Sequence, residues 1–490
     1  MDLTYHNILL VGSILLFISL FAGKTSSRFG VPVIILFISV GMLAGSEGIG
    51  GILFSNPKTT QFIGVIALCC ILFSGGLDTD WGHVKPVLWQ GVLLSTAGVL
   101  ITAFSVALFV WLITDFTLIE ALLLGSIVSS TDSASVFSIL RSKNLALKGN
   151  IRSILELESG SNDPMAYVMT LICTGLVMHQ NSSAAEIITL FSKDLILGGA
   201  LGLIIGMAGT IVINRIRFDY EGLYIALVIA IMFFSFSLTD FLKGNGFLAV
   251  YICAIYIGNH DVIHKKKILK SFDSFAWLMQ IILFLTLGLL VLPSQLLEVM
   301  GIGMLVAGFL ILVARPLSIF LSLMPFRITS RVKLFLSWGG LRGAVPIVFA
   351  TYPLLAGAEK AGTIFNIVFF VSLTSVVIQG TSLAKVARWL HLTLPVNLKQ
   401  RNKSDIEFTE SPKSLLTEVI VKEGCPAAGK KIVQLGWPTT IVISTIERDG
   451  KYFIPTGATK LEKGDRLFLL AENRDSLNYV FDCVNIKQQL

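Results

Sequence analysis

The feature that most constrains this chain is a series of long apolar stretches that fills its first 391 residues. A membrane-crossing helix needs roughly 20 apolar residues, and about thirteen such stretches, some short or broken, are separated by short polar connectors. The sequence therefore predicts an all-α polytopic membrane protein rather than a soluble globular one. The stretches lie near 6–23, 31–45, 60–77, 87–113, 118–140, 153–178, 194–214, 222–239, 244–258, 272–292, 299–323, 333–355 and 362–390.

The distribution of charged residues divides the chain into two parts. Charged residues make up about 11% of positions 1–391 and about 26% of positions 392–490, and the second value is typical of soluble domains. We therefore predict a membrane domain at 1–394, a polar linker at 395–414 and a small α+β cytoplasmic domain at 415–484.

The basic residues indicate how the helices are oriented. With the N-terminus outside, the connectors that face the cytoplasm carry about four times as many lysines and arginines as the opposite connectors, which places the C-terminal domain in the cytoplasm. The net charge of +7 is thus a topology signal. A nucleic-acid site would need basic residues clustered on one soluble face, so we expect no nucleic-acid partner.

Four of the six cysteines, Cys69, Cys70, Cys173 and Cys253, lie in apolar stretches. No cysteine spacing matches a zinc site or a redox pair, and buried small apolar residues are the better reading. We expect no cofactor.

Ionisable residues within the apolar stretches are the first candidates for function, because each costs at least about 3 kcal/mol to insert. The fifth stretch, LLLGSIVSSTDSASVFSIL, contains Asp132 within a run of serines and Thr131. Serine and threonine compete for backbone hydrogen bonds and can open a helix. Irregular backbone at membrane depth is tolerated where it is buried in protein or lines a cavity, which makes this segment a candidate site.

The sixth stretch contains ELESGSNDPMAYV. On a helix, Glu158 with Asn162 and Ser159 with Asp163 are spaced four residues apart and form two adjacent stripes. Pro164 lacks an amide hydrogen and frees one backbone carbonyl. Carboxylate, hydroxyl, amide and carbonyl oxygens together suit a hard cation.

The twelfth stretch, WGGLRGAVPIVFATYP, has glycines and a proline that can break the helix around Arg342, and Arg315 lies in the eleventh. The two arginines can neutralise two of the three acids in these stretches. One of Asp132, Glu158 and Asp163 is then left to carry a proton or a cation. If spans 1–6 and 8–13 form two halves, the interrupted fifth span corresponds to the interrupted twelfth. Matching interruptions of this kind are typical of a transporter site.

Four motifs, TDSASVF, ESGSNDP, GNGFLAVYICAIYIGN and GGLRGAVPIVFA, resemble the monovalent cation/proton antiporters of the NhaP and sodium/proton exchanger family. The resemblance covers essentially all of residues 1–391. It implies thirteen helices, a six-helix inverted repeat, crossed broken helices five and twelve, and a homodimer.

The same resemblance assigns the site residues. It implies that Asp163, preceded by Asn162, is the essential acid, that Ser159 and Thr131 coordinate the monovalent cation, and that Asp132 is the acid of the broken fifth helix. Glu158 is expected to pair with Arg315, and Arg342 is expected near Asp132. Because Asn162 stands where some relatives carry a second aspartate, the resemblance also implies electroneutral one-for-one exchange.

The polar tail has alternating runs typical of strands, LTEVIVK, TTIVISTIERDG, KYFIPTG and DRLFLLA, with a hairpin turn expected at Asp449 and Gly450. The segments GKKIVQLGWP and SLNYVFDCV are predicted as short helices. The tail resembles the C-terminal subdomain of TrkA-type potassium-conductance regulators, the TrkA-C domain. That resemblance implies dimerisation and a small regulatory ligand.

The resemblance therefore implies a potassium/proton antiporter of the bacterial cytoplasmic membrane, not an enzyme. A sodium or lithium/proton antiporter is the alternative within the family. Two other classes stay open: a regulated cation channel, although no carbonyl-ring filter segment is evident, and an intramembrane aspartyl protease that uses Asp132 and Asp163.

Overall fold

The computed structural model describes residues 5–29, 32–54, 56–143, 145–178, 184–394, 415–421, 427–437, 441–448 and 451–471. It forms two compact units, Met1–Lys399 and Gln400–Leu490, each described here by itself. The division lies within the predicted linker, whose residues 395–414 are outside the described ranges, so the predicted domain limits stay predictions.

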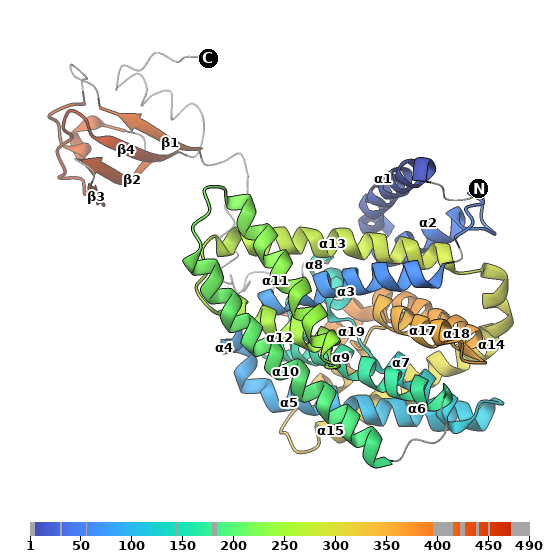
Figure 1. Cartoon of the computed structure of the whole chain (residues 1–490). Helices are drawn as coiled ribbons and strands as arrows, with labels where there is room; N and C mark the ends of the chain where they lie inside the picture. Colours follow the sequence, from blue (N-terminus) through green and yellow to red (C-terminus); the bar gives the residue numbers. More distant parts are fainter. Residues whose placement is uncertain are drawn as a thin grey trace. The chain divides into compact units, whose positions relative to one another are not determined.

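The first unit is helical (Figure 1), and each predicted apolar stretch overlaps one helix or one interrupted pair of helices. In chain order the helices are α1 (Tyr5–Phe29), α2 (Val33–Ala44), α3 (Pro57–Asp78), α4 (Trp81–Val84), α5 (Leu88–Leu93), α6 (Val99–Ile113), α7 (Leu118–Ser129), α8 (Ser133–Ser142), α9 (Ile151–Met178), α10 (Ala184–Arg215), α11 (Glu221–Phe241), α12 (Gly246–Asn259), α13 (Lys265–Leu290), α14 (Pro293–Phe309), α15 (Arg315–Ser322), α16 (Ser330–Trp338), α17 (Ala344–Ala356), α18 (Ala361–Ser375) and α19 (Thr381–Trp389).

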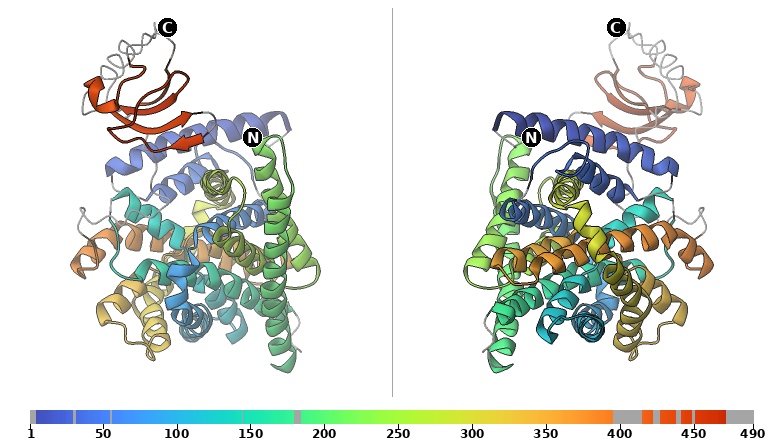
Figure 2. Two further views of the ribbon diagram at one scale, coloured as in Figure 1. Left: turned by 90° about the vertical axis from the view of Figure 1, so that its left-hand side faces the viewer. Right: turned by 90° about the vertical axis from the view of Figure 1, so that its right-hand side faces the viewer.

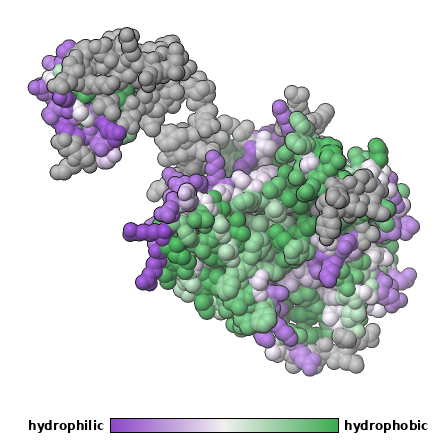
Figure 3. Space-filling model, turned by 45° about the horizontal axis from the view of Figure 1, so that its top comes forward, coloured by the Kyte–Doolittle hydropathy of each residue, from purple (hydrophilic) through white to green (hydrophobic). Residues whose placement is uncertain are grey.

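Eight helices or continuous helix pairs of the described residues are long and apolar enough to cross a membrane, and four shorter apolar helices accompany them. These lengths do not test the predicted count of thirteen crossings, which stays a prediction. Large apolar side chains are exposed on the outer helices, among them Leu9, Ile196 and Phe234. Hydrophobic residues form a broad area on the surface of this unit (Figure 3), as expected for a surface that meets lipid.

The helices of the first unit pack in two groups. In one group α3 lies against α12 and α13, and α2 also packs on α13. In the other, α7 packs between α6 and α9, and α14 packs on α18. Helix α17 packs on α18 and belongs to the second group. Its contacts with α3, and those of α9 with α12, join the two groups. The views in Figure 2 place α1, at the blue end of the chain, on the rim of the unit.

Three π-helical turns interrupt long helices: η2 (Leu94–Gly98) before α6, η3 (Leu310–Ala314) before α15 and η4 (Val376–Gly380) before α19. Such turns are rare in proteins, and those that occur often lie at functional sites. The first two lie in the fourth and eleventh predicted spans. These spans correspond under the predicted two-halves arrangement, so they form a second matched pair of interruptions beside the fifth and twelfth.

The four cysteines of the apolar stretches, Cys69, Cys70, Cys173 and Cys253, are buried and free, as predicted. The other two, Cys425 and Cys483, lie outside the described residues.

The second unit contains a four-stranded antiparallel sheet with the order β1-β4-β2-β3. Apolar residues such as Val419, Ile446 and Leu467 are buried beneath it. Inside this unit Arg448 forms two hydrogen bonds of 2.7 and 2.8 Å with the buried carboxylate of Asp465. The strands are β1 (Leu415–Ile420), β2 (Ile441–Arg448), β3 (Lys451–Phe453) and β4 (Arg466–Ala471).

All four predicted strands are confirmed, because alternating apolar residues specify a sheet with one buried face. The first predicted helix is reduced to a 3-10 turn, η6 (Ile432–Leu435), which is followed by Gly436 in the left-handed conformation. The predicted turn at Asp449 and Gly450 and the final helix SLNYVFDCV lie outside the described residues.

Candidate functional site

The first helix break separates α7 from α8 and is built from polar side chains. Ser130, Thr131 and Asp132 lie between the two helices. The Asp132 carboxylate caps α8, because it accepts a hydrogen bond from the backbone amide of Ser135 at 3.0 Å and another from the Ser135 hydroxyl. Aspartate is one of the preferred N-cap residues, so the acid ends the break by starting the next helix.

The second break separates α16 from α17 and spans Gly339–Gly343. The backbone amide of Asp132 donates to the carbonyl of Leu341 at 2.8 Å, so the two breaks are joined directly. Glycine is required at this junction: a Cβ on Gly343 would lie 2.2 Å from Oδ2 of Asp132. The predicted meeting of broken spans five and twelve is thus present in the structure.

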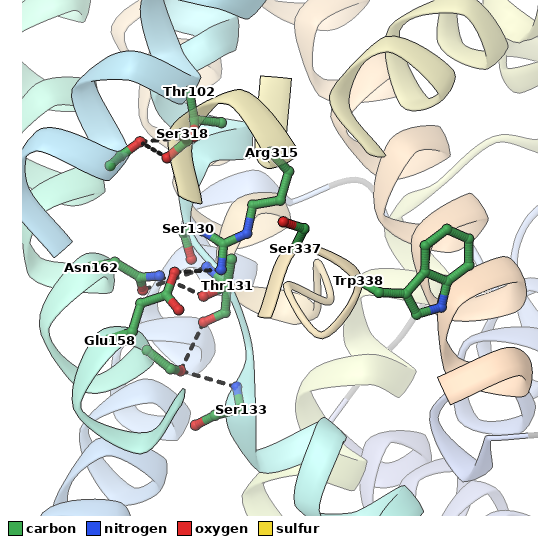
Figure 4. Close-up of polar contacts among 12 residues, drawn as sticks. Thr102, Ser130, Thr131, Ser133, Glu158, Asn162, Arg315, Ser318, Ser337 and Trp338 are labelled. Atoms are coloured by element: carbon green, nitrogen blue, oxygen red, sulfur yellow. Dashed lines mark hydrogen bonds and ion pairs between the residues drawn. The ribbon is translucent and has the colours of Figure 1, made fainter. Parts of the chain in front are cut away.

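Helix α9 lies against the first break and presents its polar stripe to it (Figure 4). The Ser130 hydroxyl donates to Oδ1 of Asp163 at 2.5 Å. The Ser159 hydroxyl donates to the Thr131 carbonyl at 2.8 Å, and Nδ2 of Asn162 donates to Oγ1 of Thr131 at 2.5 Å. The structure therefore brings together all five predicted binding residues, the fifth being Asp132 beside them.

Most of these groups are buried, and Asp132 is partly exposed. Asn162 and Ser130 are fully buried, and Thr131 and Asp163 are 4% and 6% exposed. The Asp163 carboxylate and the Ser130 hydroxyl that donates to it offer oxygen atoms, which suit a hard monovalent cation. Across the described residues, no group of three or more histidine, cysteine or acidic side chains could hold a metal ion.

The two buried arginines have different partners. Arg315 forms the expected ion pair with Glu158, and both side chains are almost fully buried. Arg342 instead donates from Nη1 to the carbonyl of Ser130 at 3.0 Å. Arg342 lies near Asp132 as expected, because its neighbours Leu341 and Gly343 both pack against that residue. Its expected ion pair is not present among the described residues, because Asp132 caps α8 and Arg342 extends toward the Ser130 carbonyl.

A cavity of about 140 Å³ gives access to the site. It is lined by Asp132, Ser159 and Asp163 and also by exposed charged residues of the surface, including Arg141 and Asp273. Arg141 lies in a connector predicted to face the cytoplasm. The cavity therefore reaches Asp163 from the end of the unit that carries Arg141 and Asp273.

Sequence reasoning missed three residues that complete the site: Ser130, Ser375 and Gln379. The signal for Ser130 was its place in the same polar run as Thr131, but nothing in the run indicates which hydroxyl faces Asp163. Ser375 and Gln379 are two polar residues four apart in the last apolar stretch, and both are buried.

Comparison with known proteins covers both parts of the chain. Residues 13–389 match the family model described as sodium/hydrogen exchanger, transmembrane, and residues 416–478 match the TrkA-C domain. The chain is 36% identical to the protein named K(+)/H(+) antiporter NhaP of Alkalimonas amylolytica, over 95% of this chain and 81% of the relative. It is also 36% identical to the K(+)/H(+) antiporter NhaP2 of Shewanella sp. (strain MR-4), over 96% of this chain and 82% of the relative.

The fold is also similar to a solved structure, that of the sodium proton antiporter MjNhaP1 from Methanocaldococcus jannaschii at pH 8. The TM-score is 0.66 at 24% sequence identity, over 76% of this chain and 98% of the other.

Proposed function

The chain belongs to the sodium/hydrogen exchanger family, and from that membership we propose that it exchanges potassium for protons across a membrane at Asp163. It is a transporter and not an enzyme. We propose potassium rather than sodium as the transported cation, because two relatives named as K(+)/H(+) antiporters align over at least 95% of this chain. Sodium or lithium exchange is the second candidate, since the structural neighbour is named as a sodium proton antiporter.

One observation carries the assignment of Asp163. Of the buried acids, Glu158 is neutralised by Arg315, whereas no described lysine or arginine forms an ion pair with Asp163. Asp163 also lines the cavity and accepts a hydrogen bond from Ser130, a neutral donor. A buried carboxylate that lines a cavity and forms no ion pair among the described residues is suited to bind either a proton or a cation.

Exchange follows if proton and cation compete for this carboxylate. A buried charge is costly, so the site moves between the two sides when the carboxylate is neutralised by one ligand or the other. Beside Asp163, Nδ2 of Asn245 at the start of α12 donates to the Pro164 carbonyl at 2.7 Å, and neither residue lines the cavity. This buried contact joins α9 to the other helix group next to Asp163.

Further parts of the proposal concern assembly and orientation. The resemblance supports a homodimer, one-for-one exchange through Asn162, a bacterial cytoplasmic membrane and a cytoplasmic C-terminus. The TrkA-C match supports binding of a small regulatory ligand by the second unit.

The test is proton flux in everted membrane vesicles challenged separately with potassium, sodium and lithium salts. We expect proton movement with potassium and no net current. Asp163→Asn should abolish the flux, because an amide cannot exchange a proton for a cation. The matched control is Asp240→Asn, which changes an exposed aspartate on α11 and should retain exchange.

Near wild-type flux in Asp163→Asn would contradict the assignment of Asp163. Flux with sodium and lithium but not potassium would support the second candidate. A current without coupled proton movement would indicate a channel instead.

A further inference from the structure

A buried pair of side chains on the last helical span holds the second break in place. Nε2 of Gln379 donates to the carbonyl of Trp338, the last residue of α16, at 2.9 Å. Oε1 of the same amide accepts a hydrogen bond of 2.5 Å from the Ser375 hydroxyl. The oxygen of that hydroxyl in turn accepts a hydrogen bond of 2.9 Å from the backbone amide of Arg342. One glutamine therefore reaches the backbone on both sides of the break, directly before it and through Ser375 within it.

These bonds replace what the helix break removes. Where a helix is interrupted, backbone carbonyls and amides lose their partners, and in a membrane domain such groups need partners within the protein. The Trp338 carbonyl and the Arg342 amide are two such groups. Ser375 is fully buried and Gln379 is 1% exposed, so water does not readily substitute for either bond. Gln379 lies in η4, the π-helical turn that ends the apolar run of α18.

The second break in turn positions the partners of Asp163. With its backbone amide held by Ser375, Arg342 extends its guanidinium to the Ser130 carbonyl at 3.0 Å. The hydroxyl of the same Ser130 donates to Asp163. Hydrogen bonds linked through residues Arg342 and Ser130 thus lead from Gln379 to the carboxylate, although Gln379 does not line the cavity.

We propose that Gln379, acting through Ser375, is a positioning residue for cation/proton exchange: it sets Arg342 against Ser130 and so determines how well a cation competes with a proton at Asp163. This inference rests on the proposed function. The hydrogen bond from Ser130 and the nearby positive charge of Arg342 both favour the ionised carboxylate, the form that binds a cation. If the hydrogen bonds of Gln379 and Ser375 are lost, protons compete better with the cation for Asp163. A higher cation concentration is then needed at the same pH.

The experiment measures exchange against potassium concentration and pH for Gln379→Met, Ser375→Ala and the double variant. Each single variant should raise the potassium concentration at half-maximal rate about fivefold, the size expected for loss of one buried hydrogen bond, and shift the pH profile to more alkaline values. The maximal rate at saturating potassium should fall less than about twofold. The double variant should be no worse than the stronger single one, because the two residues act in one series.

The matched control is Gln295→Met. Gln295 is exposed on α14 and accepts a hydrogen bond from Asn366 at 3.3 Å, away from the break, so its loss should leave half-saturation and pH profile unchanged. If a variant reaches the membrane but transports too slowly to assay, the rise in melting temperature caused by potassium in detergent gives the same comparison.

The outcomes separate the two proposals. Wild-type chain without potassium/proton exchange would overturn the proposed function. Wild-type exchange together with an unchanged half-saturation and pH profile in both single variants would overturn this inference alone. Reduced protein stability with unchanged potassium dependence would also overturn it, because Gln379 would then be structural and not positioning.

Discussion

The two helix breaks that meet at the site are built in opposite ways. The first, between α7 and α8, is a run of hydroxyls and one carboxylate whose side chains reach α9. The second, between α16 and α17, is mostly glycine and receives the side chains of its neighbours. A Cβ on Gly340 would lie 2.4 Å from Nε of Arg315, and a Cβ on Gly343 would collide with Asp132.

This difference indicates a division of labour. The first break supplies a hydroxyl oxygen to Asp163, whereas the second supplies space for neighbouring side chains and one positive charge, Arg342. Substitutions should therefore act differently at the two places. The second break should be sensitive to added volume and to the charges packed over it, and the first should be sensitive to the loss of particular polar atoms.

The largest effect is expected for Arg315→Met, which removes the charge packed over Gly340. Glu158 would remain buried without a partner, and breaking a buried ion pair from one side costs about 3–5 kcal/mol. The double variant Arg315→Met/Glu158→Leu removes both charges and should recover most of that loss. Thermal unfolding in detergent measures both. A double variant as unstable as the single one would show that the pair is not what stabilises this region.

Added volume at the second break should come next. Gly343→Ala places a methyl group where the Asp132 carboxylate lies and pushes the two breaks apart. A misplacement of about 1 Å near a reacting centre can cost about a hundredfold in rate, and we expect a loss of exchange of that size.

The control for this change is Gly362→Ala on α18, where a Cβ would meet no atom within 4 Å. Vesicle flux at equal protein levels checks the pair. Equal rates in the two variants would mean that the junction of the breaks tolerates an added methyl group. The second break would then not be sensitive to added volume.

How far the sequence predicted these features depends on what each one requires. Glycine, proline and charge in an apolar stretch are informative along a single chain, so the sequence predicted both breaks correctly. The role of Asp163 stays a prediction. Hydrogen-bond partners on other helices were not predicted. The hydrogen bonds of Gln379 and Ser375 reach residues 41 and 33 positions away, and their existence depends on how α18 packs on the second break.

Asp132 illustrates the same limit in another form. An acid inside a membrane span indicates an ion site, but the same acid is also a favoured helix cap, and the sequence alone does not distinguish the two roles. In the structure the cap is made. The role of Asp132 in binding the cation stays a prediction.

Two substitutions of Asp132 separate these roles. Asparagine caps a helix about as well as aspartate, whereas alanine loses about 1 kcal/mol of cap stability. If Asp132 acts as the cap of α8, Asp132→Asn should retain most of the exchange and Asp132→Ala should be less stable by about that amount. If its charge carries the ion, both variants should lose exchange equally. Vesicle flux and melting temperature together decide between these results.

The smallest effect is expected where the first π-helical turn, η2, packs against α15, the helix that follows the turn η3. The carbonyl of Gly98 accepts hydrogen bonds from Ser318 at 2.7 Å and from Thr102 at 2.8 Å, and both donors are buried. Ser318→Ala leaves the carbonyl with one side-chain donor, Thr102, so exchange should change less than about twofold and stability by about 0.5–1 kcal/mol.

Removing both donors should cost about the sum of the single changes. Gly98 is the N-cap of α6, and an N-cap carbonyl already accepts the first intrahelical bond, so Ser318→Ala/Thr102→Val does not leave this carbonyl unpaired and should cost about 1–2 kcal/mol. The measurement is a double-mutant cycle on melting temperature, with exchange at saturating potassium as the second readout. A loss much larger than the sum would mean that the two hydroxyls substitute for each other. Loss of exchange in Ser318→Ala alone would mean that this second pair of interruptions, like the first, contributes to transport and not only to packing.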